Sequence, residues 1–502
     1  MAASETSGAR GVFSAPLREF LRSPSPENTL FDHVEAAVEA AVKGAAEGRR
    51  SRLRGELPVA GAEGRALRLL LLGYSGTGNV GADIRVAEMV RQIRHLFGRE
   101  RIDFQLLAVG GHGLAAEAPG VVVSQGDGYL PEMLARRVAA ADGVVACEGS
   151  MFKSGFSNML ALMLTGGLAL ASAEHKLALA WAAEAGTMDG RLRKFVEQHC
   201  AEALAIVRNP PSEQILAGLG LRTFLGADPA WTYRPESAGR AEELLRSAGW
   251  DGRAPVICVC PANPFWYPVR PDVARTQELA KTGAHREDHF ASVLFHERSE
   301  ETVRQYQHYL DQLAAAVREQ AARSHGFPVV IGMEKLDIKA CEDLAGRFPR
   351  GAPVLMSGTL SAGEIVAVLR RADLLVSSRY HAVLTATPGL TPTVGVAGDE
   401  RIPNLLAELG RPDLSVPAGA PDLGDRLATA IAAATSDADG LRRAQGLLVA
   451  GQIRRVGLGG RRAAAEVERV YPGFHDPAPD AGWDRFIPPV DPVVEELLER
   501  HG

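Results

Sequence analysis

Two short apolar runs, near residues 375 and 395, are each followed directly by charged side chains. Leu374–Ser377 is long enough for a buried strand and leads into Arg379 and His381. Thr393–Ala397 leads in the same way into Asp399–Arg401. An arginine can hold a carboxylate or phosphate in a fixed two-pronged geometry, and a histidine can transfer a proton near neutral pH. Taken alone, Arg379 could simply form an ion pair with a carboxylate, and His381 could simply cap a helix. Because both follow one strand and a second charged strand end is expected at the same edge of the sheet, a binding site is the better explanation.

A glycine-rich segment follows the first predicted strand, Leu67–Leu72, and precedes a helix predicted from about residue 83 to residue 97. Free N–H groups and the helix dipole can bind an anion at such a turn, although a tight turn that only glycine fits has the same pattern. The segment matches the Gly-x-Gly-x-x-Gly fingerprint of dinucleotide-binding proteins. However, the next predicted strand, 104–109, ends without the acid that would hold a ribose, and a P-loop lysine is missing, so nicotinamide, flavin and P-loop enzymes are not expected. The residues placed to contact an anion are Gly76, Gly78, Asn79, Gly81 and Asp83.

Apolar runs and helical patterns alternate along the rest of the chain, and the series starts afresh at Pro255–Cys260. Such alternation predicts parallel sheets that helices cover on both faces. We therefore predict an α/β fold with two Rossmann-like domains of mainly parallel strands facing a cleft, at residues 65–245 and 250–435. Residues 1–64 are predicted to form a partly helical appendage, and residues 436–502 a helical and then proline-rich tail.

An insertion rich in histidine and aromatic residues, 261–298, interrupts the second predicted domain. His285 and His289 are spaced by one helical turn, but the glutamate that directly follows the first histidine in a zincin motif is absent. A mobile cover over a ligand explains the insertion better than a metal site does. We expect neither a metal nor a cofactor.

The composition is that of a soluble globular protein with more than one core, since 46% of the 502 residues are hydrophobic and 23% are charged. The formal net charge of -6 argues against a general nucleic-acid binder. Five scattered cysteines fit a reducing cytoplasm, and Cys258 and Cys260 fit buried thiols better than a metal site. The N-terminus lacks a signal-peptide pattern, and Met159–Ala173 is too short and interrupted to cross a bilayer. We expect a cytoplasmic protein without a transmembrane segment, in which this stretch is a buried helix.

Three segments, in this order, resemble the signatures of the polysaccharide pyruvyl transferases. The first is the loop Gly73–Asp83. The second is Arg208–Ser212 before a helix that ends in Leu-Gly, followed by a strand and Asp228–Ala230. The third is Ser377–His381 at a strand end, followed by Gly-x-x-Pro and by Asp399–Arg401. The order and spacing of all three make the resemblance more specific than any one of them.

The resemblance covers about residues 67–410 and includes departures from the family pattern. Asn209 replaces an aspartate, and the segment 147–154 replaces a glycine-rich turn. Met333 follows a strand that often leads to a histidine, and Arg401 stands near a lysine position. These changes bear on the acceptor and on the reaction more than on the donor site.

The resemblance implies an enzyme that moves pyruvate from phosphoenolpyruvate onto two hydroxyls of a sugar as a cyclic ketal and releases phosphate. It implies a GT-B-like fold with the site between the domains, and a place in exopolysaccharide or cell-envelope synthesis. The donor's carboxylate and phosphate need cationic anchors, which Arg208 and Arg379 can provide. The implied catalytic residues are His381, Arg379 and Asp228. The remaining implied contacts are Ser212, Asp399 and Arg401 with the donor, and Gly76, Gly78, Asn79, Gly81, Asp83 and Glu148 with phosphate or an acceptor hydroxyl.

Two other classes stay open. A GT-B glycosyltransferase that uses a nucleotide sugar would need paired acids to hold ribose, and Asp399 with Glu400 is a partial match. A non-catalytic member of a glycan pathway would explain the loss of the glycine-rich turn. The expected partners of the leading class are phosphoenolpyruvate and a sugar or glycan acceptor, with no nucleic acid. A lipid-linked acceptor would bring the protein into peripheral contact with a membrane.

Overall fold

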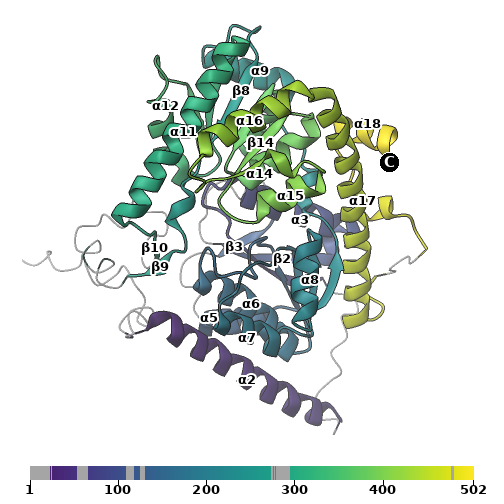
Figure 1. The fold of residues 1–502 in the computed structure, drawn as a ribbon. Helices are drawn as coiled ribbons and strands as arrows, with labels where there is room; N and C mark the ends of the chain where they lie inside the picture. Colours follow the sequence, from purple (N-terminus) through teal and green to yellow (C-terminus); the bar gives the residue numbers. More distant parts are fainter. Residues whose placement is uncertain are drawn as a thin grey trace, which may run out of the picture.

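The computed structural model describes residues 23, 25–53, 66–108, 118–124, 131–272, 275, 278, 294–475 and 480–502. The pair His285 and His289, half of the predicted insertion, and residues 1–22, 24 and 54–64 of the predicted appendage lie outside these ranges. In the described part of the chain, two parallel sheets of seven and six strands form two stacked bodies, each covered by helices (Figure 1).

Seven parallel strands form the first sheet. They are β1 (Leu67–Leu72), β2 (Ile102–Leu107), β3 (Val122–Ser124), β4 (Gly143–Ala146), β5 (Leu177–Ala183), β6 (Leu204–Val207) and β7 (Arg222–Leu225). Their order is β3-β2-β1-β4-β5-β6-β7, so the chain starts in the middle and winds outward to each side in turn. The connecting helices are α3 (Val80–Phe97), α5 (Pro131–Ala140), α6 (Asn158–Ala173), α7 (Gly190–His199) and α8 (Pro210–Gly218).

The second sheet repeats this plan. Its strands are β8 (Val256–Cys260), β11 (Phe327–Gly332), β12 (Val354–Met356), β13 (Leu374–Ser377), β14 (Thr393–Ala397) and β15 (Ser415–Pro417), in the order β12-β11-β8-β13-β14-β15. The helices are α9 (Ala238–Ser247), α11 (Glu300–Ser324), α12 (Ile338–Ala345), α13 (Ala362–Arg371), α14 (Tyr380–Ala386), α15 (Arg401–Glu408) and α16 (Leu423–Ser436). Two short antiparallel strands, β9 (Arg270–Pro271) and β10 (Leu294–Phe295), pair with each other within the predicted insertion.

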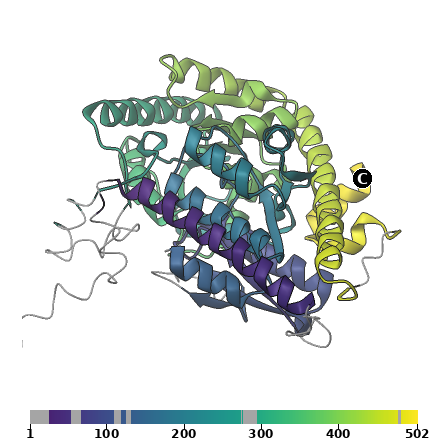
Figure 2. The same ribbon diagram turned by 90° about the horizontal axis from the view of Figure 1, so that it is seen from below.

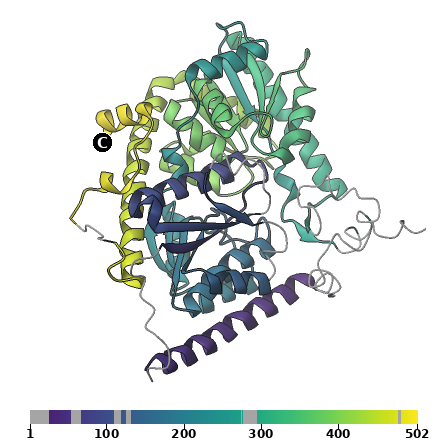
Figure 3. The ribbon, with the colours of Figure 1, turned by 180° about the vertical axis from the view of Figure 1, so that it is seen from behind.

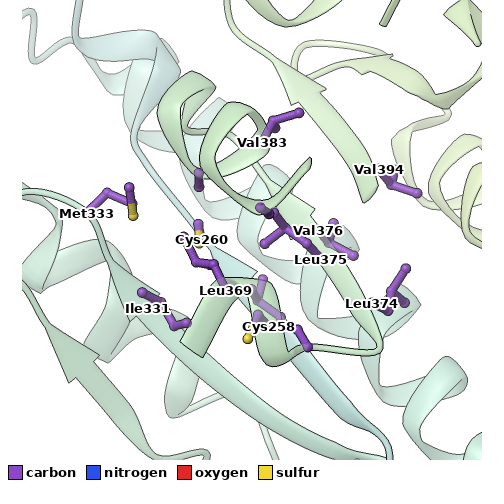
Figure 4. Close-up of a cluster of buried hydrophobic side chains, with 14 of the residues drawn as sticks. Cys258, Cys260, Ile331, Met333, Leu369, Leu374, Leu375, Val376, Val383 and Val394 are labelled. Atoms are coloured by element: carbon purple, nitrogen blue, oxygen red, sulfur yellow. The ribbon is translucent and has the colours of Figure 1, made fainter. Parts of the chain in front are cut away.

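Central strands of both sheets are apolar along their whole length because helices cover both of their faces. Every residue of β8 is buried, and Cys258 and Cys260 lie among Ile331, Leu375 and Val376 in the core of the second sheet (Figure 4). All five cysteines are free and buried, so these thiols behave as small apolar side chains, as predicted for Cys258 and Cys260.

Two long helices, α17 and α2, pack on the outside of the sheet-and-helix layers. The 33-residue helix α17 (Ala438–Val470) contacts α16 of the second body and α3, β5 and β7 of the first (Figure 3). The predicted helical tail therefore returns to the first sheet. The helix α2 (Pro26–Leu53) lies across α5 and α6 (Figure 2). Its buried residues Leu30, Val34 and Val38 recur every four positions and form one apolar stripe.

Some boundaries differ from the sequence patterns. The helix predicted from residue 83 begins at Val80, because the Asn79 side chain accepts the backbone N–H of Ala82 and caps it. The edge strand β15, which ends at Pro417, was not predicted; three residues carry too little alternation to detect, and proline is tolerated at an edge. Helix α9 precedes the domain boundary that was predicted near residue 250, but it packs against α13 of the second body. The position of this boundary stays a prediction.

Close packing of the C-terminal segment on α17 can be tested with two glycines of that helix. A Cβ at Gly460 would lie 2.6 Å from the carbonyl oxygen of Phe486, whereas nothing lies within 4 Å of a Cβ at Gly451. We expect Gly460→Ala to lower the free energy of unfolding by about 1–3 kcal/mol through overpacking. Gly451→Ala should raise it by about 0.5–1 kcal/mol, because alanine loses less backbone entropy. Urea unfolding of both variants measures the difference, and equal effects would contradict this packing.

Candidate functional site

Residues from both sheets meet where β6, β7 and β13 end. Arg208 follows β6 directly, and Asp228 follows β7 as the N-cap of a short 3-10 helix. In the second sheet, β13 is followed by Arg379 and by His381 in the first turn of α14. The His381 Nε2 atom lies 3.5 Å from Asp228 Oδ2, and the Arg208 guanidinium lies 4.2 Å from the ring centroid of Tyr380. The predicted residues Arg208, Asp228 and His381 therefore form one cluster.

Arg208 is almost completely enclosed by carboxylates. Its Nη1 donates to Asp228 Oδ2 over 2.8 Å, and its Nε donates to Glu184 Oε2 over 2.7 Å. Its Nη2 donates to Glu184 as well, and the Arg208 side chain is only 2% exposed. Because both acids pair with this guanidinium, they raise its pKa against the opposing effect of burial. A side chain so buried and paired serves to fix its neighbours.

A second buried arginine, Arg85 of α3, supports the same aspartate. Its Nη1 donates to Asp228, and its Nη2 donates to the carbonyl oxygens of Cys147, Trp181 and Ala182 over 3.0–3.3 Å. Two of these carbonyls turn toward Arg85 at an irregularity in β5, where Ala182 has a φ of 54°. Alanine in the left-handed region is strained, and such strain persists where the surroundings require it. The bulge therefore connects the end of β5 to the site.

Charges around Asp228 and His381 set their protonation states. Burial opposes the charge on Asp228, but Arg85, His381 and Arg208 outweigh it and hold the pKa well below its usual range. Burial lowers the pKa of His381, and the positive charges of Arg85 and Arg208 lower it further against the opposing effect of Asp228. Asp228 is thus an anion and His381 a neutral imidazole at neutral pH, with buried Nε2 facing the carboxylate.

Arg379 is held by two acids from the segment that follows β11. Its Nε donates to Asp337 Oδ2 over 2.9 Å, and its Nη1 lies 2.9 Å from Glu334 Oε2. Glu334 also accepts the Tyr74 hydroxyl of the first body over 3.0 Å. Burial and Glu334 raise the pKa of Asp337 to about 6, while Arg379 acts in the opposite direction. Arg379 keeps 20% of its side chain exposed, so it is more accessible than Arg208.

Arg401 has the least occupied guanidinium of the three predicted arginines. Its Nε donates to Asp399 Oδ2 over 2.8 Å, and among the described residues no acceptor meets its Nη atoms. Asp399 also pairs with the buried Lys153 over 3.0 Å. The Lys153 ammonium and the Arg401 guanidinium both lie over the Phe156 ring, 4.7 Å and 4.6 Å from its centroid. Arg401 is 24% exposed and can accept an anion.

The glycine-rich loop brings backbone close to the histidine. A Cβ at Gly81 would overlap the Nδ1 atom of His381, so only glycine fits there. Gly76 and Gly78 have φ of 75° and 78°, and the Gly76 N–H donates to Asp83 over 2.8 Å. Asp83 thus holds the loop together. These positions require glycine for the turn and for close approach, whether or not an anion binds.

Ser212 and Glu148, two other predicted contacts, have local partners in the structure. The buried Ser212 hydroxyl accepts the Ala185 N–H over 3.0 Å, which fixes the chain after β5. The carboxylate of Glu148 accepts the N–H of Ser150 over 3.2 Å in the turn after β4. Asn209 caps α8 by accepting the N–H of Ser212, so this departure from the family pattern keeps the cap.

Several residues of the cluster were not singled out from the sequence. Arg85 lies within a helical pattern that looked entirely like core, and Glu184 lies just past an alanine-rich strand. Glu334 and Asp337 stand two and five residues after β11, at the same sheet edge as His381. Their place directly after a predicted strand could have identified Glu334 and Asp337 as members of the site. Lys153 belongs to the segment that departs from the family pattern.

Neither a cluster of potential metal ligands nor a membrane-spanning helix is found in the described ranges. No group of three or more His, Cys, Asp and Glu side chains among the described residues could hold a metal ion. No described helix is both long and apolar enough to cross a bilayer.

Part of the chain matches a known protein family. Residues 186–400 match the Polysaccharide pyruvyl transferase family. The resemblance predicted from the sequence is confirmed over this stretch, which includes Arg208, Asp228, Arg379 and His381. The glycine-rich loop lies outside it. No curated protein sequence matches the chain.

Solved structures resemble the fold at low sequence identity. A protein assigned as UDP-N-acetylglucosamine 2-epimerase from Listeria monocytogenes is 10% identical, with a TM-score of 0.51, over 80% of this chain and 96% of that chain. HepE of Anabaena in complex with UDP-glucose is 12% identical, with a TM-score of 0.49, over 80% and 100%. UDP-GlcNAc 2-epimerase of Methanocaldococcus jannaschii is 11% identical, with a TM-score of 0.46, over 74% and 93%. The predicted fold, two Rossmann-like bodies in a GT-B-like arrangement, is confirmed.

Burial of His381 predicts a pH dependence of stability. Its pKa is lower in the folded protein than the ordinary value of 6.5, so only the unfolded chain gains this proton as the pH falls through about 6.5. Stability should therefore be fully present above that pH and decrease below it. We expect His381→Gln to show a smaller loss of urea midpoint between neutral and mildly acidic pH than the parent. An equal loss in both would place the histidine outside the buried contact with Asp228.

Replacing the buried Arg85 is expected to lower the free energy of unfolding strongly. Arg85→Met leaves three carbonyls and part of the Asp228 charge without a partner, which should cost about 3–5 kcal/mol. The matched control is Arg304→Met, since Arg304 is 66% exposed and pairs with Glu301 on the surface. That change should stay within about 1 kcal/mol. Chemical denaturation measures both, and a loss below about 1 kcal/mol for Arg85→Met would contradict the buried network.

Proposed function

We propose that this protein transfers pyruvate from phosphoenolpyruvate to two hydroxyls of a sugar or glycan, forming a cyclic ketal and releasing phosphate. The observation that carries the proposal is the contact between His381 and Asp228 across the two bodies, beside accessible arginines. The family match over residues 186–400 supports the reaction class. No cofactor is required, because the donor itself carries the reactive enol and the leaving phosphate.

The donor's charges favour Arg379 and Arg401 as its anchors. Phosphoenolpyruvate carries a carboxylate and a phosphate, so two cations with free faces are needed. Arg379 and Arg401 are 20% and 24% exposed, whereas Arg208 is 2% exposed. Both accessible arginines act on the pKa of the buried Tyr267, which burial and Glu334 raise. The charges of both therefore act on the same tyrosine, and Arg208 orients Asp228.

His381 is the proposed acid for the first step. As a neutral imidazole it first takes the proton of the first acceptor hydroxyl, and it then gives this proton to carbon 3 of the donor while the hydroxyl oxygen forms a C–O bond to carbon 2, where positive charge develops. Asp228 stabilises the imidazolium that exists between these two proton transfers. The second hydroxyl then forms its own bond to carbon 2, the bond to the phosphate oxygen breaks, and the hydroxyl proton leaves with phosphate. One molecule of ketal and one of phosphate result.

A nucleotide-sugar glycosyltransferase is less well supported by this arrangement. The acids that would hold ribose are already in ion pairs, since Lys153 lies 3.0 Å from both Asp399 and Glu400. A non-catalytic glycan-binding protein would not need the His381–Asp228 contact. Cytoplasmic location and a role in exopolysaccharide or cell-envelope synthesis remain part of the proposal through the family.

Two substitutions test the assignment. His381→Ala should slow phosphate release in the presence of acceptor by about 10²–10⁴-fold, while phosphoenolpyruvate binding largely survives. Arg401→Lys keeps the charge but loses the two-pronged geometry, so donor binding should weaken by about 1.5–3 kcal/mol. Phosphate assays, titration calorimetry and NMR detection of the ketal methyl group measure these effects on one preparation.

The control for these substitutions is His308→Ala, an exposed position on α11 that should leave turnover unchanged. If activity of His381→Ala falls only in proportion to a lower folded fraction, the histidine is structural. Tight binding of a nucleotide sugar without binding of phosphoenolpyruvate would replace the proposal by the glycosyltransferase class.

A further inference from the structure

A hollow of about 630 Å³ opens beside the cluster, on the side of α7 and α8. Its first-body wall includes Ala185 and Met188 of the turn after β5, Arg193 of α7, and Gln214 and Ile215 of α8. The volume is in the range of ligand pockets and exceeds what a single small anion fills.

The second body closes the hollow with two side chains, Glu400 and Asn404, at the start of α15. Glu400 is placed there by Lys153 of the first body, whose ammonium lies 3.0 Å from Oε1. A Cβ at Gly186 would overlap the same carboxylate, so the two bodies touch at this rim. The hollow is therefore a feature of the interface between the sheets.

A hydrogen-bonded path connects the hollow to the reactive cluster. The Asn404 Nδ2 atom donates to Glu184 Oε1 over 3.2 Å, and Glu184 Oε2 accepts from Arg208 Nε over 2.7 Å. Arg208 in turn bonds Asp228, which faces His381. A ligand that contacts Asn404 would lie one carboxylate away from Arg208.

The chemistry of the walls suits a neutral polyhydroxylated ligand. Ile215 leaves 37% of its side chain in water and offers an apolar surface beside the amides of Gln214 and Asn404. One positive charge on Arg193 and one negative charge on Glu400 balance formally, so the hollow has no preference for an anion. A sugar ring combines an apolar face with a rim of hydroxyls, which can donate hydrogen bonds to amide and carboxylate oxygens.

We propose that this hollow binds a neutral sugar unit of the acceptor, with its ring on Ile215 and its hydroxyls on Asn404, Gln214 and Glu400. The assignment as acceptor rests on the proposed function, whereas sugar binding itself does not. The anionic donor and the neutral acceptor then occupy different sides of the cluster. Arg401 and Arg379 attract the donor, and the charge-balanced hollow takes the sugar.

A bulky side chain at Gly218 tests the site without disturbing the fold. Gly218 lines the hollow, and nothing lies within 4 Å of a Cβ placed there, so Gly218→Trp should fill the space from the surface. The matched control is Gly190→Trp, also without neighbours within 4 Å but outside the lining. Thermal unfolding of both variants verifies that they fold.

Binding is measured by saturation-transfer difference NMR on the full chain without donor, using the methyl glycosides of glucose, galactose and mannose at millimolar concentration. We expect signal from at least one glycoside with the parent and with Gly190→Trp, and none with Gly218→Trp. Absence of signal with the parent, or an unchanged signal with Gly218→Trp, would overturn the proposal.

The kinetic measurement separates this proposal from the proposed function. With an active acceptor, Gly218→Trp should raise the KM for the acceptor about tenfold or more and leave the KM for phosphoenolpyruvate unchanged. Glycoside binding that Gly218→Trp abolishes, without phosphate release from phosphoenolpyruvate, would keep the sugar site and reject pyruvyl transfer. Phosphate release with the same acceptor KM in Gly218→Trp and Gly190→Trp would instead keep pyruvyl transfer and reject the sugar site.

Discussion

The buried carboxylate of Asp228 is the interaction on which the site depends. An isolated carboxylate in a protein interior is unfavourable by many kcal/mol, so it requires partners there. Arg85 and Arg208 supply the positive charge from within the first body, and His381 reaches the same oxygen from the second. One atom, Oδ2, therefore orients two arginines and the histidine. A shift of the two sheets at this point would remove the imidazole from the buried carboxylate that it faces.

Most other charges near this point are neutralised in the same way. Glu184 balances Arg208, and Lys153 balances Asp399 together with Glu400. Arg379 has two carboxylates and still leaves a fifth of its surface to solvent. The guanidinium of Arg401 is less completely paired, since no described acceptor meets its Nη atoms and 24% of the side chain is exposed. These atoms are therefore available to an anion from outside the chain.

Backbone geometry is as restrictive as the charges. The bulge at Ala182 turns two carbonyls onto Arg85, and the lack of a side chain at Gly81 makes room for the imidazole of His381. Tyr74 of the same glycine-rich loop bonds Glu334, which holds Arg379. Movement of the loop would therefore reach both the histidine and the accessible arginine. This explains why a loop outside the family match is part of the site.

The sequence by itself determined the alternation of strands and helices, and hence two parallel sheets whose carboxyl ends carry Arg208, Asp228, Arg379 and His381. Local signals suffice for this, because strand length, helix periodicity and turn residues are properties of neighbouring positions. Motif order was enough to indicate the family that residues 186–400 match.

Only the tertiary structure decided which charges compensate one another. The pairs Arg85–Asp228 and Arg208–Glu184 join residues that are 143 and 24 positions apart. Lys153 and Glu400 are 247 positions apart, and they meet only because the two sheets face each other. No local pattern encodes the exposure of a guanidinium or a hollow between two bodies. Accessible and enclosed arginines look alike in a sequence, and burial, a property of the whole packed chain, distinguishes them.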